Sequence, residues 1–481
     1  MKKKDQTYQD SSTEDIVLRY ENAQKEGRSE YFDVDDLEVL IDHYMEKNKV
    51  DTTQAIIQLG LTLHPCNTDL TIAKAKVALF IGQIRESEEI AAHLQQVEPE
   101  NLDVQLLSGQ ILLCRGMQNE AKALFDKILQ KDREYIYDIA YAYFDAGDYT
   151  NAIPFFEQEL QRHPAKEELE VLFDLAYCHQ QRNDWKKAVA LYEKLLDEDP
   201  YSKDAWFNLG QIYFIQNDLE KATEAFDYAY IVGNDYQALL QKGNALFQSG
   251  KLQSAIESYK EYADANGRAA FVIVYIGECY EKMGDFEQAK IFYSEALRSE
   301  PTNTSALCGL CICHMEQDEY EKGLQFIDHA IEITPTLAEA WLYKAEAHLN
   351  LNDTDEALRC YKKAADLDPE MSEAMFAIGN IYIDKGEYAT ALEYYQKGAN
   401  IDHGNDKIPL YLAITHFKLG ETELAYNYLG EAIAQDAEFQ NIFFEICPEA
   451  KQVKEFSQLF QPTHGDDESS DNVKSYFSND I

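Results

Sequence analysis

Proline and glycine are scarce in this sequence of 481 residues, which has only 11 prolines and 22 glycines. This composition favours helices with tight connections over β-structure with many turns. Runs of 18 apolar residues are absent, so no transmembrane helix is expected. The basic start lacks the apolar stretch of a signal peptide. The nine cysteines show no pairing pattern, which predicts reduced thiols and a cytoplasmic location.

Positive charge is also in short supply. The chain has 43 Lys and Arg residues against 87 Asp and Glu residues, a net charge of −44. Such a negative surface repels nucleic acid and anionic membranes, so we expect neither as a partner. Basic or neutral partners fit this charge better.

Internal repetition is what the sequence has in abundance. We number the repeat unit so that Lys203 is position 1. Position 20 is then an alanine in each unit except one, where Gly323 replaces it. From Ala255 onward, this position recurs every 34 residues. The recurring alanines are Ala121, Ala152, Ala188, Ala222, Ala255, Ala289, Ala357, Ala391 and Ala425. Position 8 holds a small residue: Gly109, Ala140, Ala176, Gly210, Gly243, Gly277, Cys311, Ala345, Gly379 and Ala413. Position 24 holds an aromatic or large apolar residue: Phe125, Phe156, Tyr192, Phe226, Tyr259, Tyr293, Ile327, Tyr361, Tyr395 and Leu429.

These positions have a physical reading as a pair of antiparallel helices. Small residues at positions 8 and 20 let the two backbones approach closely, and the aromatic residue at position 24 fills the volume between neighbouring units. Proline at position 32, as in Pro200 and Pro301, ends the second helix. Connectors such as "MGD" at 283–285 turn the first helix into the second. One pair cannot bury both of its faces, so stability must come from stacking.

The pattern resembles the tetratricopeptide repeat family, in its bacterial multi-repeat type. The resemblance implies an all-α fold, a right-handed superhelical solenoid of about twelve helix pairs. Ten units match over residues 102–437, and two degenerate units precede them over 34–101. We expect a flexible segment at 1–33 with a short helix near 14–26, a capping helix at 438–460, and an acidic disordered tail at 461–481.

In this family, positions 2, 5, 9, 12 and 13 of the first helix line a concave groove that often binds peptides. Carried onto this sequence, the resemblance implies these groove residues: Tyr137, Tyr141, Phe144, Phe173, Tyr177, Phe207, Gln211, Phe214, Asn244, Phe247 and Phe271. Packing between neighbouring first helices is the alternative role for Phe173 and Phe207. Tyr141 and Tyr177 are the ones expected to face a ligand. The two-carboxylate clamp of chaperone-binding members lacks its basic residues here, so chaperone tails are not expected as ligands.

The segment "CGLCICHM" at 308–315 has the look of a metal or redox site. Its Cys311 occupies position 8, and Cys313 occupies position 10, where Cys178 and Cys279 stand in their own units. Histidine at position 11 takes the place of a tyrosine. We therefore predict packing rather than metal binding, and leave open a reactive thiol at Cys308.

The sequence carries none of the common nucleotide-binding, metalloprotease, serine-hydrolase or EF-hand motifs. The repeats also take up nearly the whole chain. We therefore expect a non-catalytic protein without a cofactor or metal, which acts as a scaffold that binds a protein or peptide in its groove. The alternative is a self-associating structural solenoid, although a monomer is favoured. The partner's identity, and whether the acidic tail occupies the groove, are left open.

Overall fold

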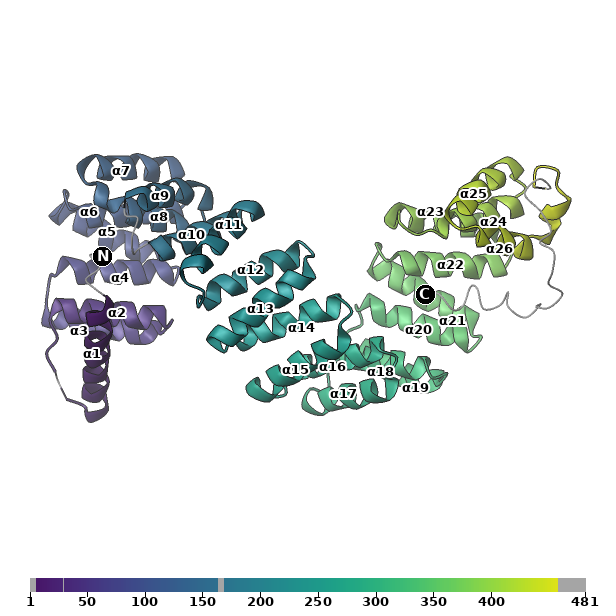
Figure 1. The fold of residues 1–481 in the computed structure, drawn as a ribbon, viewed down its shortest axis with the longest axis horizontal. Coiled ribbons are helices and arrows are strands. Elements are labelled where there is room, and N and C mark those ends of the chain that lie inside the picture. The colour runs from purple at the N-terminus through teal and green to yellow at the C-terminus, as the bar shows by residue number, and fades with distance from the viewer. Residues whose placement is uncertain (1–5, 29, 163–167, 457–481) are drawn as a thin grey trace. The chain divides into compact units, whose positions relative to one another are not determined.

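The computed structural model describes residues 6–28, 30–162 and 168–456 (Figure 1). In these ranges the regular secondary structure is entirely helical, without a β-strand, which confirms the predicted all-α class. Two compact units, Met1–Asn217 and Asp218–Ile481, divide the chain between α12 and α13. We describe each unit by itself.

The first unit contains α1 to α12. Their bounds are α1 (Gln6–Glu26), α2 (Val34–Glu46), α3 (Val50–Leu63), α4 (Thr68–Phe80), α5 (Ile84–Val97), α6 (Leu102–Cys114), α7 (Gln118–Lys131), the 3₁₀-helix η1 (Arg133–Tyr135), α8 (Ile136–Asp145), α9 (Tyr149–Arg162), α10 (Glu168–Gln181), α11 (Trp185–Glu198) and α12 (Lys203–Ile215).

The second unit contains α13 to α26. Their bounds are α13 (Leu219–Gly233), α14 (Tyr236–Gln248), α15 (Leu252–Asn266), α16 (Ala270–Lys282), α17 (Phe286–Ser299), α18 (Thr304–Met315), α19 (Tyr320–Ile333), α20 (Ala338–Asn350), α21 (Thr354–Leu367), α22 (Ser372–Asp384), α23 (Tyr388–Ile401), α24 (Ile408–Lys418), α25 (Thr422–Gln435), α26 (Glu438–Ile446) and the 3₁₀-helix η2 (Pro448–Gln452). Helices α2 to α25 thus supply the twelve predicted repeats.

The connector between the two helices of a repeat follows one scheme. Each contains one residue with left-handed φ, for example Gly284 at 74° and Asn352 at 61°. Around Gly284, the N–H of Asp285 donates to the carbonyl of Tyr280 at 2.9 Å, which satisfies a terminal carbonyl of α16. Glycine, asparagine and aspartate tolerate this conformation best, which explains the predicted connectors.

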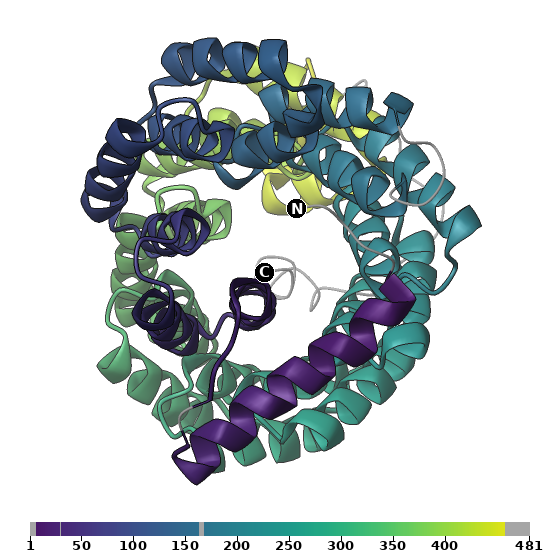
Figure 2. The same cartoon turned by 90° about the vertical axis from the view of Figure 1, so that its left-hand side faces the viewer.

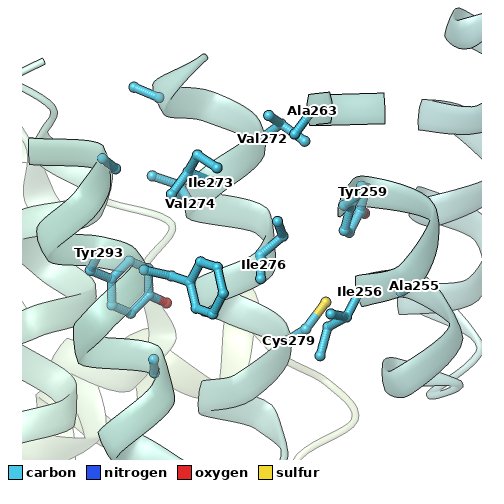
Figure 3. Packing of buried hydrophobic residues seen from close by; sticks show 14 of the residues in the cluster. Ala255, Ile256, Tyr259, Ala263, Val272, Ile273, Val274, Ile276, Cys279 and Tyr293 are labelled. Carbon is cyan, nitrogen blue, oxygen red and sulfur yellow. The ribbon is translucent and has the colours of Figure 1, made fainter. Parts of the chain in front are cut away.

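The core lies between the helices of successive repeats, and the position-24 aromatic residue is its centre. A Cβ placed on Gly243 would lie 2.5 Å from Cε1 of Tyr259, and one on Gly277 would lie 2.7 Å from Cε1 of Tyr293. In these two repeats the ring of the same repeat leaves no room for a Cβ at position 8, whereas Ala140, Ala176 and Ala345 occupy that position in other repeats. Figure 3 shows Ile276 and Cys279 of α16 between Tyr259 on one side and Tyr293 on the other.

The two ends of the repeat array are covered by helices outside the repeat pattern. Helix α1, the purple helix in Figure 2, begins at Gln6, before the predicted 14–26. Its Tyr20 ring lies 6.0 Å from both Phe32 and Tyr44. The described part of the predicted capping segment 438–460, which ends at residue 456, contains α26 and η2, and Phe443 of α26 stays buried beside α24. The predicted acidic tail, 461–481, lies outside the described residues.

Candidate protein-binding surface

The first helix of a repeat contacts the first helix of the next repeat in both units. In the first unit, α4 contacts α6 and α6 contacts α8, and in the second unit α16 contacts α18 and α18 contacts α20. We call the outward surface of these even-numbered helices the first-helix face of each unit. All the predicted groove residues belong to even-numbered helices.

Aromatic side chains gather on the first-helix face of the first unit, on α8 and α10. We call Tyr137, Tyr141, Phe144 and Tyr177 the aromatic cluster. Neighbouring ring centroids lie 4.8 Å apart for Tyr137 and Tyr141, 5.8 Å for Tyr141 and Phe144, and 5.6 Å for Phe144 and Tyr177. All four side chains are half-buried. Three of them contact the ring of Phe156, the buried position-24 residue of α9.

Hydroxyl groups of the aromatic cluster form hydrogen bonds within the fold. Tyr137 Oη donates to Tyr141 Oη at 3.2 Å, and Tyr141 Oη donates to Oδ2 of Asp174 on α10. Burial and then the Asp174 carboxylate raise the pKa of Tyr141 well above its usual range. Tyr141 is therefore a protonated bridge between α8 and α10, and it contributes to stability as well as to the surface.

The other predicted residues of the first unit lie on α10 and α12. The ring of Phe173 is 5.7 Å from that of Tyr192 on α11, so it packs within its own repeat, a role different from the packing between neighbouring first helices that was considered for it. Gln180 Nε2 donates to Oε1 of Gln211 at 3.4 Å across the two helices. Phe207 and Phe214 are half-buried on α12.

The second unit holds three predicted residues, which do not form one cluster. Asn244 Oδ1 accepts a hydrogen bond from the buried Tyr259 Oη at 2.8 Å, so this amide holds a core residue in place. Phe247 lies under the ammonium of Lys282, 4.4 Å from the ring centroid. Phe271 is 42% exposed, and its ring contacts Tyr262 and Tyr275.

Position-24 tyrosines direct their hydroxyl groups toward the first-helix face, which the sequence reasoning missed. Tyr192, Tyr259, Tyr293 and Tyr395 donate to Gln180, Asn244, Glu281 and Asn380, at 2.9, 2.8, 2.6 and 2.7 Å. These acceptors occupy positions 9 and 12 of the preceding helix. A polar residue at position 9 or 12 followed by Tyr at position 24 was the sequence signal.

The cysteines of "CGLCICHM" are packing residues. Cys308, Cys311 and Cys313 are 7%, 0% and 0% exposed. Burial raises the pKa of Cys308 to about 12, so its thiol stays protonated at neutral pH and is a poor nucleophile. Among the described residues, no three His, Cys, Asp or Glu side chains are grouped so that they could hold a metal ion. Within the same residues, no helix has the length and apolar character needed to cross a membrane.

Family models described as "Tetratricopeptide repeat" match residues 137–203, 173–236, 236–267, 272–303 and 340–404. A model described as "Anaphase-promoting complex, cyclosome, subunit 3" matches residues 288–364. The matched segments begin at α8 and extend through α23.

Curated relatives match only parts of their length. Sperm-associated antigen 1 of Rattus norvegicus is 34% identical over 15% of this chain and 8% of its own. Protein CTR9 homolog of Arabidopsis thaliana is 26% identical over 23% of this chain and 10% of its own. Protein bimA of Emericella nidulans is 23% identical over 43% of this chain and 26% of its own. The chain therefore spans about a quarter or less of the length of these relatives.

Solved structures with a similar fold are bacterial and other repeat proteins of low identity. MamA is 22% identical with a TM-score of 0.32, over 36% of this chain and 94% of its own. A tetratricopeptide repeat protein from Parabacteroides merdae is 15% identical with a TM-score of 0.40, over 49% of this chain and 93% of its own. YrrB, described as a TPR protein with an unusual peptide-binding site, is 18% identical with a TM-score of 0.31, over 38% of this chain and 95% of its own.

Proposed function

Because the chain belongs to the tetratricopeptide repeat family, we propose that it is a non-catalytic scaffold that binds a protein or peptide on the first-helix face of its first unit. The repeat fold is typical of protein-interaction scaffolds. The observation that carries the proposal is the aromatic cluster of α8 and α10. Its four rings are half-buried on the first-helix face, and three of them rest on Phe156.

Aromatic side chains suit this purpose. Tyr and Phe offer a large contact area and lose little conformational entropy when a partner covers them. Contacts among the rings and the bond from Tyr141 to Asp174 hold the cluster in place before a partner arrives. A preorganised surface of this kind reduces the ordering cost of binding.

The proposal further places the protein in the cytoplasm, with a protein or peptide partner rather than nucleic acid or membrane. All nine cysteines are unpaired and seven of them are buried, which suits a reducing compartment. The net charge of −44 opposes binding to nucleic acid and to anionic lipid.

Replacement of Tyr177 by Ala tests the proposed surface. The full chain and the Tyr177→Ala variant would be crosslinked in native cell extract, and the captured proteins compared by quantitative mass spectrometry. We expect the variant to lose at least about 90% of its specific partner, because a central aromatic residue commonly contributes 2 kcal/mol or more to binding. The measurement is the ratio of captured partner to bait.

Tyr201→Ala serves as the matched control, since Tyr201 is 78% exposed and lies outside the aromatic cluster. It should capture the partner as the natural chain does. The proposal would be overturned if Tyr177→Ala, with a melting temperature close to that of the natural chain, captured the same partner in the same amount. Tyr141→Phe removes only the hydroxyl bridge and reports how much preorganisation contributes.

Self-association is the second candidate function. Its support is a pair of exposed apolar side chains one helical turn apart on α13, Tyr228 at 50% and Ile231 at 65% exposure. Two side chains form a small surface compared with the roughly 800 Å² that each partner buries in a stable interface. The aromatic cluster therefore supports partner binding more strongly than α13 supports self-association.

A further inference from the structure

A row of glutamates crosses the first-helix face of the second unit. We call Glu278 and Glu281 of α16, Glu316 directly after α18, Glu346 of α20 and Glu373 of α22 the acidic row. Each of four successive first helices contributes at least one carboxyl group. Glu278, Glu281 and Glu346 are half-buried.

The carboxyl groups are close enough to repel one another. Burial and then Glu316 and Glu373 raise the pKa of Glu346 to about 8. Burial and then Glu281 raise the pKa of Glu278 to about 7. Mutual repulsion and partial desolvation both disfavour the charged form.

The two lysines on the helices of the acidic row interact with groups outside the row. Lys344 on α20 pairs with Asp328 at 2.7 Å, and Lys282 on α16 lies over the ring of Phe247. Among the described residues, Glu278, Glu316 and Glu346 form no ion pair within 4.0 Å. Glu316 and Glu373 are exposed, but the three half-buried carboxyl groups, which lack counter-charges, are costly to ionise in the free chain.

A second, independent observation lies beside Glu346. Tyr361 on α21 is 0% exposed, and its hydroxyl group has no hydrogen-bond partner. Tyr259 and Tyr395, at the same repeat position, donate to the position-9 residues Asn244 and Asn380. Position 9 in the repeat of Tyr361 is Glu346, and burial, followed by the carboxyl group of Glu346, raises the pKa of Tyr361.

Two polar groups therefore lie together without partners at the centre of the acidic row. A buried hydroxyl group without a partner costs about 1–3 kcal/mol, and this cost is recovered if a ligand supplies the missing hydrogen bonds. A lysine ammonium group has three donors and an arginine guanidinium has five. Either can bond to the Glu346 carboxylate and to the Tyr361 oxygen at the same time.

We propose that the acidic row binds a Lys- or Arg-rich segment of a partner protein, with one cationic side chain seated between Glu346 and Tyr361. This inference goes beyond the proposed function, because it assigns a second binding surface, on the second unit, and names the chemistry of its ligand. The spacing suits an extended chain. Packed helices lie about 8–10 Å apart, and an extended chain covers that distance in about three residues. Basic residues at every third position would therefore meet successive carboxyl groups.

The spacing also distinguishes this ligand from a small cation. Among the described residues, which include all five of these glutamates, no three carboxyl groups are grouped so that they could hold one metal ion. A protein segment can contact the whole row. Its basic charges also complement the net charge of −44.

The test uses the full chain and two fluorescein-labelled ten-residue peptides at 150 mM NaCl and about pH 8.5, above the pKa of about 8 of Glu346 and below that of lysine. One has lysine at every third position and serine elsewhere, and the other has the same composition with its lysines contiguous. Binding is measured by fluorescence anisotropy. We expect the spaced peptide to bind more tightly, and Glu346→Gln to weaken its binding by at least about tenfold, as loss of one partner of a desolvated charge pair commonly does.

Glu332→Gln on α19 is the matched control, because it makes the same substitution at an exposed residue that forms no hydrogen bond or ion pair with another described side chain. It should weaken binding less than about twofold. Tyr361→Phe should weaken the binding of the spaced peptide by about threefold or more. It should not lower the melting temperature of the protein, since it removes only an unpartnered hydroxyl group. A purely structural role for Tyr361 would leave the affinity unchanged.

Several results would overturn the inference. They are no binding of the spaced peptide to the natural chain, equal effects of Glu346→Gln and Glu332→Gln, or equal displacement of both peptides by magnesium or spermine at matched ionic strength. The experiment is separate from that on Tyr177. If Tyr177→Ala loses its partner while Glu346→Gln leaves the affinity for the spaced peptide unchanged, the proposed function stands and this inference alone fails.

Discussion

At the scale of single residues, different side chains occupy the same position in different repeats and keep the same ring stacking. Position 11 is a tyrosine in several repeats, and Tyr280 stacks on Phe292 with the rings 12° apart. His314 stacks in the same way on Phe326, at 5.4 Å and 7°. Its Nδ1 also lies 2.6 Å from Oε2 of Glu319. The prediction that histidine replaces tyrosine here is confirmed, and its acidic partner five residues later was overlooked.

Glu346 makes a residue-scale prediction about pH. The groups that face it are Glu316 and Cys311 from the region of α18, Tyr361 of α21 and Glu373 of α22. Its pKa is raised to about 8 in the folded chain, against about 4.3 in an unfolded chain. Between these values the folded chain retains a proton that the unfolded chain has released.

The free energy of unfolding that depends on Glu346 therefore falls as the pH rises from about 4.3 to about 8. Glu346→Gln should melt at a higher temperature than the natural chain at pH 8.5, and the two should melt alike near pH 4. Differential scanning fluorimetry across this range is the measurement, with Glu332→Gln as the control. A difference between Glu346→Gln and the natural chain that is the same at every pH would contradict the prediction.

At the scale of the helices, close approach is decided at position 8. Gly243 lies against the ring of Tyr259, and the bond from Tyr259 Oη to Asn244 holds that ring in place. The ring cannot turn aside without losing this hydrogen bond. A methyl group at Gly243 must therefore push α14 and α15 apart.

Gly243→Ala should lower the free energy of unfolding by about 1–3 kcal/mol, the usual cost of overpacking a core. Gly430→Ala on α25 is the matched control, because it is exposed and a Cβ there meets nothing within 4 Å. That change should stabilise its helix by about 0.5–1 kcal/mol. Thermal unfolding followed by circular dichroism should move in opposite directions for the two variants; equal shifts would contradict the role of Tyr259.

Helices outside the repeat were harder to predict than those within it. Inside the array, several positions recur in phase, so each boundary is supported by many units. The terminal helices α1 and α26 occur once, and α1 begins at Gln6 where a helix over 14–26 was expected. Its sequence has no aligned copy to mark where it begins.

At the scale of the whole molecule, the chain divides between Asn217 and Asp218. The position-20 alanines are 34 residues apart from Ala188 to Ala222 and 33 apart from Ala222 to Ala255, so their spacing carries no mark of this division. The eleven predicted binding residues are thereby separated, with eight in the first unit and three in the second. The aromatic cluster and the acidic row belong to different units.

The proposed function predicts a monomer. Size-exclusion chromatography with light scattering should give a mass near 55.2 kDa at every concentration from about 1 to 100 μM, because like net charges of −44 repel one another. A mass that grows with concentration would favour self-association. Tyr228→Ser with Ile231→Ser would then show whether α13 carries the contact.

The sequence by itself determined the all-α class, the number of helix pairs and the residues of the core, because each of these depends on contacts that recur every 34 residues. It also predicted packing roles for the cysteines of 308–315, and left a reactive Cys308 open. Only the tertiary structure decided which polar side chains are hydrogen-bonded within the fold, as Tyr141 is to Asp174, and which are not, as with Glu346 and Tyr361. These relations join different helices and differ from repeat to repeat, so the period that reveals the fold carries no record of them.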